Sequence, residues 1–396
     1  MLVFTSLRRY LADARPVLIT VGLITVGLIT VGLITVILAF ASYPGTTSAT
    51  AAVFGPDQRV RLAADQTPLK GKIGLLLTKS TGAMCTAFCV GPDIIATASH
   101  CLFGTAASGK LQLSDLVFQT SRDGIVRPNL HATPIAGAET ASQSQHIISG
   151  TTRLAITPPI DAARDWAVVR LAAPACRAGG LPLSQRSIED VRRTAARGGL
   201  SEIAAHRDLP DSDLRHAAPC AVATEFPDAT ADMISRDFTN PGAVLFHSCD
   251  TGPGSSGSPM LIEGAAGPEV AGINVGTYVL SRAVIAAGDS AAPDASEPIA
   301  NTAVATSQFA SAAAELAARD LLSEVRDVQR LQRLLRSAGF FNRPASGRFT
   351  PALGDAIARF EQASGLSETR LMRRALLSEL AAWRPRTQLM PATARR

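Results

Sequence analysis

Three short segments of the sequence contain the residue types that nucleophilic catalysis by a serine requires. His100 follows the apolar run 94–97, Asp165 stands just before the apolar run 166–171, and Ser256 lies in a Gly-Ser-Ser-Gly-Ser-Pro turn. A serine hydroxyl is a weak nucleophile until a base takes its proton, and an imidazole that titrates near neutrality suits that task. A buried carboxylate can fix the tautomer of the imidazole and stabilise the imidazolium that forms. The three segments therefore predict covalent catalysis at a serine.

The turn around Ser256 meets a second requirement of this chemistry. Glycine beside the serine lets the backbone turn sharply, so that two amide N–H groups can converge on a developing oxyanion. Taken singly, each segment has an ordinary structural explanation, because a histidine after a strand or a Gly/Ser-rich turn is common in folded proteins. Together, in the order His, Asp, Ser, the segments favour catalysis over that explanation.

The elements that must position these side chains are short and rich in β-forming residues. From residue 53 to about residue 281, apolar runs alternate with Gly, Pro or Asp, which predicts an all-β barrel or sandwich. Examples of the runs are Ile73–Leu77, Phe88–Val90, Ile94–Thr97, Trp166–Leu171, Ala243–His247, Met260–Ile262 and Val270–Val275. Residues 185–207 are more helical or irregular, and residues 286–300 are predicted to form an exposed loop.

The pattern becomes helical from about residue 303, so the fold class changes near residue 320. Apolar residues at spacings of three and four predict three short helices over 327–382. Periodicity alone indicates only a small helical domain of unknown role.

The N-terminal region contains a long uncharged run, 17–41, built on repeats of Leu-Ile-Thr-Val-Gly. It is apolar on all sides and long enough to cross a hydrocarbon core of about 30 Å. Arg8, Arg9 and Arg15 precede it, which keeps the start cytoplasmic and exports the rest. Its length favours a signal-anchor helix in the inner membrane, whereas the small-x-small sequence that ends at Ala41 favours a cleaved signal peptide. Both forms predict export, to the bacterial periplasm or cell envelope.

Charge is distributed unevenly along the 396 residues, whose net charge is +5. Residues 317–396 hold 15 Arg against 7 Asp and Glu, a local +8, so residues 1–316 sum to −3. Aromatic residues make up only 5% of the chain, which argues against a stacking platform for nucleic acid. The six cysteines are an even number, which suggests disulfides in an exported protein, and no C-x-x-C motif supports a metal site.

Around the three catalytic segments the sequence resembles the trypsin/chymotrypsin family of serine proteases, over about residues 53–315. The resemblance implies a chymotrypsin-like all-β double barrel and peptide hydrolysis through an acyl-enzyme, without metal or cofactor. It assigns His100 as the general base, Asp165 as the orienting acid and Ser256 as the nucleophile. The backbone N–H groups of Gly254 and Ser256 would form the oxyanion hole.

A bacterial branch of this family, which includes the glutamyl endopeptidases, is similar at residues 54–59 and 249–257. The resemblance implies the disulfides Cys85–Cys101 and Cys220–Cys249. The remaining cysteines, Cys89 and Cys176, either form a third disulfide or stay as buried free thiols.

The residues expected to line the specificity pocket are Asp250, Asn274, Val275 and Gly276. Asp250 lies six residues before the nucleophile, where trypsin carries the Asp that selects basic substrates, but it follows Cys249 and we interpret it as structural. Glutamyl endopeptidases carry a histidine at the position of Asn274 that helps to bind the substrate Glu. Its absence argues against strict specificity for Glu.

The C-terminal helical segment resembles the peptidoglycan-binding domain of many cell-wall enzymes. The resemblance is carried by VQRLQRLLRSAGFF, by SGRFTPALGDAIARFEQASGL and by the leucines that follow. Ser346, Thr350 and Glu361 depart from the usual Asp, Gly and Gln of that domain. The predicted domains are 1–41 (signal peptide or signal-anchor helix), 42–52 (linker), 53–315 (protease), 316–326 (linker helix), 327–384 (peptidoglycan-binding-like domain) and 385–396 (basic tail).

The sequence thus predicts an exported serine endopeptidase that cleaves proteins and is held at peptidoglycan by its C-terminal domain. Two alternatives stay open. One is a non-catalytic envelope-binding protein that kept the protease fold, and the other is a hydrolase of peptidoglycan stem peptides. The presence of all three catalytic residue types argues against the first alternative.

Overall fold

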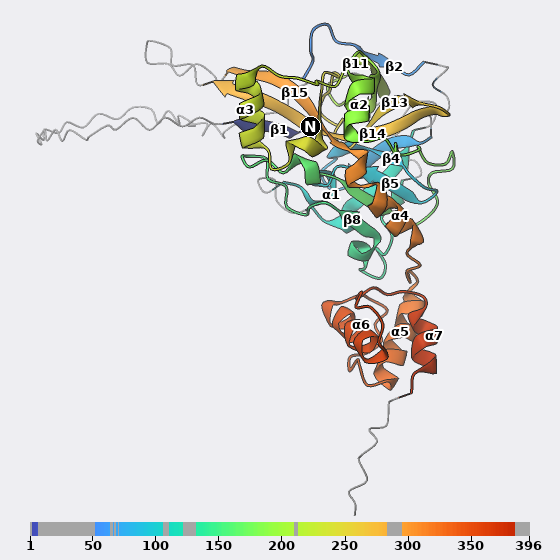
Figure 1. Ribbon diagram of the computed structural model, residues 1–396. Coiled ribbons are helices and arrows are strands. Elements are labelled where there is room, and N and C mark those ends of the chain that lie inside the picture. The colour runs from blue at the N-terminus through green and yellow to red at the C-terminus, as the bar shows by residue number, and fades with distance from the viewer. Residues whose placement is uncertain are drawn as a thin grey trace, which may run out of the picture.

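The computed structural model describes residues 2–6, 52–63, 66, 69, 71–105, 111–121, 132–209, 213–282 and 295–384. The strands form two mainly antiparallel sheets that lie against each other, and a helical domain follows at the C-terminal end (Figure 1). Short strands separated by turns therefore do produce an all-β region, as the alternation of apolar runs and turn residues predicts.

The first sheet curls until its ends meet. In order across the sheet, its strands are β7 (Thr133–Pro134), β6 (Leu116–Thr120), β3 (Ile73–Thr78), β4 (Met84–Cys89), β5 (Ile94–Thr97), β9 (Ala167–Arg170) and β8 (Ile147–Ser149). A bridge between Ile135, which follows β7, and Leu171, which follows β9, joins the two sides of the sheet. This contact closes the first barrel and removes most of its exposed strand edges.

The second sheet closes in the same way. In order, its strands are β12 (Val244–His247), β15 (Ala295–Ala305), β14 (Gly267–Arg282), β13 (Pro259–Gly264), β10 (Leu200–Ala205), β11 (Leu214–Cys220) and β2 (Arg59–Arg61). A bridge between Val222 and His247 joins the chain after β11 to β12. Off this path, the short strand β1 (Leu2–Ser6) pairs in parallel with residues 276–280 of β14.

The helices are few in the protease region and dominate the C-terminal one. They are α1 (His100–Phe103), α2 (Ile188–Ala195), α3 (Asp228–Asp237), α4 (Ala310–Ala318), α5 (Val325–Ser337), α6 (Pro351–Ser364) and α7 (Leu376–Ala382). One apolar core extends through both barrels and includes Leu316 of α4 and Phe309, which directly precedes this helix; both are fully buried. The predicted three-helix domain corresponds to α5, α6 and α7.

Two predictions about connecting segments are wrong. Residues 286–300 were expected as an exposed loop, but β15 begins at Ala295 and pairs with both β12 and β14. Its residues are small and weakly β-forming, so pairing with two neighbours overrides local propensity. Residues 316–326 were expected as one helix, but α4 ends at Ala318 and α5 begins at Val325.

The side chain of Arg170 explains why α4 stops. Its Nη2 donates to the carbonyl oxygen of Leu316 at 2.6 Å and to that of Arg319 at 3.3 Å. A cationic donor at these carbonyls satisfies acceptors that a helix leaves unpaired at its C-terminus. The chain then runs without helix into the C-terminal domain, where Leu322 is fully buried and Leu321 forms a bridge with Arg373.

The C-terminal domain is held by its own apolar core, which Leu322 shares with residues of all three helices. Glycine in the left-handed conformation ends α6 at Gly365, and Thr350 caps its start by accepting a hydrogen bond from the Leu353 amide. Glu361, on α6, is buried and accepts hydrogen bonds from the Thr369 and Arg370 amides and from Arg373. Burial raises the pKa of Glu361, but the hydrogen bonds from these donors outweigh that effect and hold the pKa below its ordinary value.

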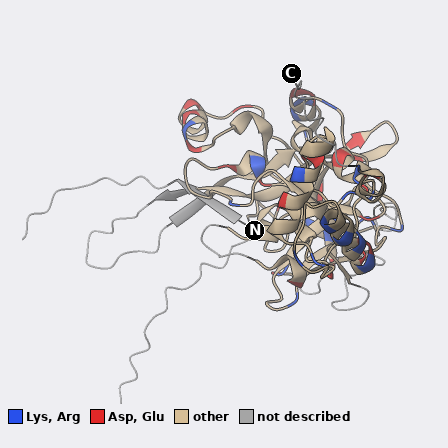
Figure 2. Ribbon diagram, turned by 90° about the horizontal axis from the view of Figure 1, so that it is seen from below, with Lys and Arg blue, Asp and Glu red and all other residues tan. Residues whose placement is uncertain are grey.

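The outer face of α5 is basic. It carries four exposed arginines, Arg326, Arg330, Arg333 and Arg336, at spacings of four, three and three (Figure 2, blue). Residues at these spacings share one face of a helix. Within the described part of the chain, none of the four forms an ion pair.

The predicted membrane segment 17–41, most of the linker 42–52 and the basic tail 385–396 lie outside the described residues. Among the residues that are described, no helix has the length and apolarity needed to cross a membrane.

The burial of Leu322 leads to a prediction about where the C-terminal domain begins. Leu322→Ala removes a fully buried side chain and should lower the free energy of unfolding of this domain by about 2–5 kcal/mol. Leu377→Ala, at a half-buried position of α7, is the control and should cost less. Calorimetric unfolding of the full chain measures the stability of both variants. An equal loss of unfolding free energy in Leu322→Ala and Leu377→Ala would mean that residues 319–324 are only a linker.

Candidate active site

The register of two strands brings His100 and Asp165 together. β5 and β9 are antiparallel, and Thr97 at the end of β5 pairs with Ala167 at the start of β9. His100 lies three residues after Thr97, in the first turn of α1, and Asp165 lies two residues before Ala167. Both side chains therefore leave the same edge of the first barrel.

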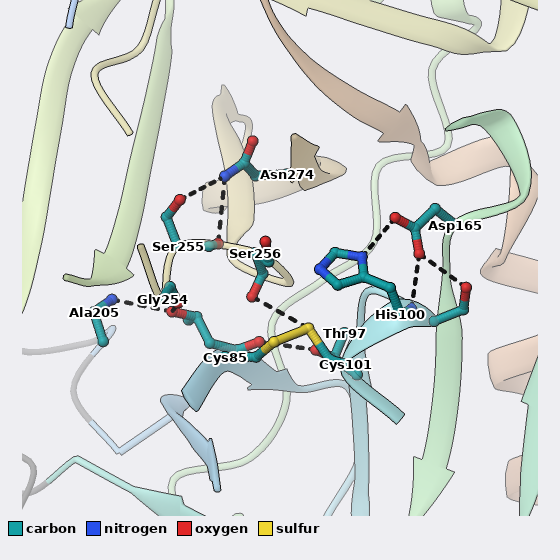
Figure 3. The surroundings of a disulfide bond; sticks show 12 residues. Cys85, Thr97, His100, Cys101, Asp165, Ala205, Gly254, Ser255, Ser256 and Asn274 are labelled. Carbon is teal, nitrogen blue, oxygen red and sulfur yellow. Dashed lines mark hydrogen bonds and ion pairs between the residues drawn. A yellow bond between two sulfur atoms is a disulfide. The ribbon is translucent and has the colours of Figure 1, made fainter. Parts of the chain in front are cut away.

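The Asp165 carboxylate is fully buried and is surrounded by donors from one turn of the chain. Its Oδ1 accepts hydrogen bonds from the His100 amide at 3.0 Å and from Ser99 Oγ at 2.8 Å. Its Oδ2 lies 2.7 Å from His100 Nδ1. Figure 3 shows the His100 ring between Asp165 and Ser256. Because Nδ1 faces the carboxylate, Nε2 is left as the ring nitrogen that can act as a base.

Ser256 comes from the second barrel, in the turn that precedes β13, and Thr86 of β4 connects this turn to the first barrel. The Thr86 amide donates to the carbonyl oxygen of Ser256 at 2.9 Å, and Thr86 Oγ1 donates to that of Gly254 at 2.8 Å. Ser256 is buried, and its Oγ makes no hydrogen bond to any described residue. The hydroxyl is thus not engaged by a structural partner.

The amides of the serine turn fall into two groups. Those of Ser255, Gly257 and Ser258 donate to the carbonyl oxygens of Gly252, Asn274 and Ser255. Among the described residues, the amides of Gly254 and Ser256 donate no hydrogen bond. These are the two N–H groups predicted for the oxyanion hole, and they remain able to donate to an incoming oxygen.

The residues predicted for the specificity pocket have different environments. Both oxygens of the Asp250 carboxylate accept backbone hydrogen bonds, from Phe54 and from Gln58, each at 2.8 Å. This is the structural role that we expected for Asp250. Asn274, Val275 and Gly276 follow one another on β14, and Asn274 Nδ2 lies 3.1 Å from Ser255 Oγ.

The segment that precedes β2 holds the serine turn from its other side. Ala52 forms a bridge with Thr251, and the buried guanidinium of Arg59 forms ion pairs with Asp57 at 2.8 Å and with Asp208 at 2.9 Å. Its hydrogen bonds to Asp57 lower the pKa of that carboxyl to about 2. A methyl group on Gly252 of the serine turn would lie 2.5 Å from Arg59 Nη1, so a larger residue there would displace the ion-paired end of this side chain.

All six cysteines are in disulfides: Cys85–Cys101, Cys89–Cys176 and Cys220–Cys249. The pairing of Cys89 with Cys176 resolves the alternative that the sequence left open. The first disulfide fixes the start of α1 to β4, next to Thr86. In the described part of the chain, Cys85, His100 and Cys101 form the one group with the spacing of metal ligands, and disulfide sulfurs cannot supply the thiolates that such a site needs.

Several residues that shape the site are not evident from the sequence. Ser99 and Thr86 give no signal, because their partners are distant in the chain. Glu202 of β10 is fully buried behind the serine turn, where Ser258 Oγ donates to its Oε1. His206 is also buried, although its polar neighbours in the sequence suggest exposure.

Comparisons with known proteins identify both parts of the chain. Residues 85–267 match the trypsin-like peptidase domain, and residues 324–369 match the putative peptidoglycan binding domain. These two matches confirm both resemblances at the level of the domain. A solved structure of a Glu endopeptidase in complex with MPD aligns with 66% of this chain and 100% of its own, at 15% identity and a TM-score of 0.41. A search of curated proteins gives no match.

Gly257, directly after Ser256, provides a test of how tightly the turn is built. It has a φ of +87°, and a methyl group there would lie 2.2 Å from both the Thr86 carbonyl oxygen and Thr97 Oγ1. Gly257→Ala should cost about 1–3 kcal/mol in backbone strain and a similar amount in overpacking, and should reduce hydrolysis sharply.

The matched control is Gly267→Ala in the β13–β14 turn, where φ is +106° but no atom lies within 4 Å of the added methyl group. Gly267→Ala should lower stability only by the backbone strain and should leave hydrolysis unchanged. Thermal unfolding and peptide hydrolysis measure both variants. Similar activity in the two would show that the serine turn tolerates displacement.

Proposed function

We propose that this protein is an exported serine endopeptidase that cleaves proteins through His100, Asp165 and Ser256. The observation that supports it most directly is the contact of His100 Nδ1 with the buried Asp165 carboxylate, at 2.7 Å, with Ser256 on the opposite side of the ring. A carboxylate in this position holds the imidazole in the tautomer that presents a basic Nε2 to the serine.

In the acylation step, Ser256 Oγ attacks the carbonyl carbon of the scissile peptide while His100 Nε2 takes its proton. The negative charge that develops on the carbonyl oxygen is accepted by the amides of Gly254 and Ser256, which have no other acceptor among the described residues. The imidazolium, stabilised by Asp165, then gives its proton to the leaving amine, and the acyl-enzyme remains.

Deacylation repeats these steps with water as the nucleophile. His100 removes a proton from water, the ester bond to Ser256 breaks, and the proton returns to Ser256 Oγ. No atom of the chain is consumed. The residues named supply both the base and the charge stabilisation that each step needs.

Two substitutions test these roles. Ser256→Ala should abolish cleavage of casein and of peptide esters, because no nucleophile remains. Asp165→Asn keeps the shape of the buried side chain but favours the wrong imidazole tautomer, and should lower kcat by about 10⁴-fold. Circular dichroism checks that both variants fold. Undiminished hydrolysis by folded Ser256→Ala would exclude Ser256 as the nucleophile.

We also propose that the C-terminal domain holds the enzyme at peptidoglycan. The match to a peptidoglycan-binding domain supports this, and so does the row of four exposed arginines on α5. Their unpaired charge would attract the carboxylates of anionic wall material. Ser346, Thr350 and Glu361, which depart from the usual pattern, all accept hydrogen bonds within the domain.

Export is supported by the three disulfides, which persist in oxidising compartments.

Export also affects the pairing of β1 with β14. If residues 17–41 span the membrane, residues 2–6 lie on the opposite side from β14, and if the chain is cut after Ala41, they are lost. Either form of the exported enzyme therefore lacks the β1–β14 pairing. N-terminal sequencing of the secreted protein separates the two forms.

The arginine row gives a prediction for wall binding. Replacing Arg326, Arg330, Arg333 and Arg336 with Gln should reduce binding to purified sacculi by about tenfold or more at low salt, and should weaken its salt dependence. The control replaces four exposed protease-domain arginines, Arg153, Arg177, Arg197 and Arg207, and so changes the net charge equally. Co-sedimentation measures both, and equal losses would mean that net charge alone, not this helix, controls binding.

A further inference from the structure

Glu202 is an unusual residue to find in the interior of the second barrel. It lies on β10, paired with Ala217 of β11 on one side and with Met260 of β13 on the other, and it is fully buried. Neither paired residue carries a charge. A carboxyl group in this position needs either donors or a proton, because burial of an uncompensated charge is costly.

The Glu202 carboxyl group has donors on one oxygen only. Its Oε1 accepts from Ser258 Oγ at 2.5 Å and from Asn274 Nδ2 at 2.9 Å. Its Oε2 is buried and has no partner among the described residues. This arrangement suits a carboxylic acid better than a carboxylate, which would require donors on both oxygens.

Asn274 links Glu202 to both sides of the nucleophile. Its Nδ2 also lies 3.1 Å from Ser255 Oγ and 3.3 Å from the Ser255 carbonyl oxygen, and its backbone carbonyl oxygen accepts from the Gly257 amide at 2.7 Å. Ser255 and Gly257 flank Ser256. Asn274 therefore determines where the backbone on each side of the nucleophile lies.

The Asn274 amide group is shared between competing acceptors. It has two hydrogens, whereas Glu202 Oε1, Ser255 Oγ and the Ser255 carbonyl oxygen are three acceptors within reach. A neutral Glu202 competes weakly for these hydrogens. An ionised Glu202 would accept more strongly and draw the amide away from Ser255.

Burial, and not the neighbouring charged groups, is the main reason that Glu202 is neutral at pH 7. Burial raises the pKa of Glu202 to about 8, and Asp250 of the serine turn adds to this, whereas Ser258, Asn274 and the more distant Arg59 of β2 act in the opposite direction. His247 of β12, beside Asn274, contributes no charge because burial lowers its pKa to about 3.

We propose that Glu202, as a neutral acid, is a positioning residue that holds the serine turn through Asn274 and Ser258, and that its ionisation sets an alkaline limit to activity. The proposal rests on the proposed hydrolytic function of Ser256. It requires no contact between Glu202 and the substrate.

The test is the pH dependence of kcat/KM for a peptide ester between pH 6 and pH 10. The wild-type enzyme should lose about tenfold in kcat/KM for each pH unit above about 8. Glu202→Gln keeps an oxygen acceptor but cannot ionise, so it should be active at pH 7 and lack this decline. Glu263→Gln, which removes an exposed carboxyl from β13 of the same barrel, is the control and should behave as wild type.

Ser258→Ala provides a second test that does not depend on the stability of Glu202→Gln. Removing a donor to Glu202 disfavours its ionised form, so the alkaline decline should move to higher pH. Two results would overturn the proposal: an alkaline decline of kcat/KM in Glu202→Gln like that of wild type, or a decline in Ser258→Ala that begins at the same pH as in wild type. An inactive wild-type enzyme would instead refute the function of Ser256.

Discussion

The burial of the Asp165 carboxylate is the constraint on which the rest of the site depends. An unpaired buried carboxylate costs several kcal/mol, whereas each hydrogen bond to a charged group returns about 1.5–3 kcal/mol. Asp165 obtains three such bonds, all from Ser99 and His100. The turn after β5 must therefore fold around the carboxylate, and the imidazole is fixed as a consequence of satisfying a buried charge.

The second half of the site depends on contact between the barrels. His100 and Asp165 belong to the first barrel, and Ser256 belongs to the second. Thr86 connects them, because it reaches from β4 to the carbonyl oxygens of Gly254 and Ser256 and also accepts a hydrogen bond from the Ala205 amide of β10. The absence of a side chain at Gly257 permits this close approach. Neither barrel alone could bring His100, Asp165 and Ser256 together in one place.

Much of this arrangement can be predicted from the sequence, because local chemistry specifies it. His100, Asp165 and Ser256 occupy distinctive short contexts, and the β-rich runs around them correspond to strands. The six cysteines are an even number and fit a known family pattern, and all of them pair. In each case the signal lies within a few residues of the site.

The remaining features depend on partners far along the chain. The segment 295–300 becomes a strand only because β14 pairs with it and the rest of β15 lies between β12 and β14. The predicted linker helix stops because Arg170, nearly 150 residues earlier in the chain, donates to its carbonyl oxygens. The role of Glu202 depends on Asn274 and Ser258, and no local pattern distinguishes it from an exposed strand residue. Burial of polar groups is set by tertiary structure, and a single sequence reports it poorly.

The central claim is that Asp165 and His100 make Ser256 a nucleophile, and covalent labelling tests it most directly. The wild-type protein is treated at pH 7 with a fluorophosphonate that reacts with activated serines, and the adduct is located by mass spectrometry of its peptides. The account predicts one adduct, on Ser256, that forms far more slowly in Asp165→Asn. A folded protein that gives no adduct, or an adduct on a different serine, would contradict it.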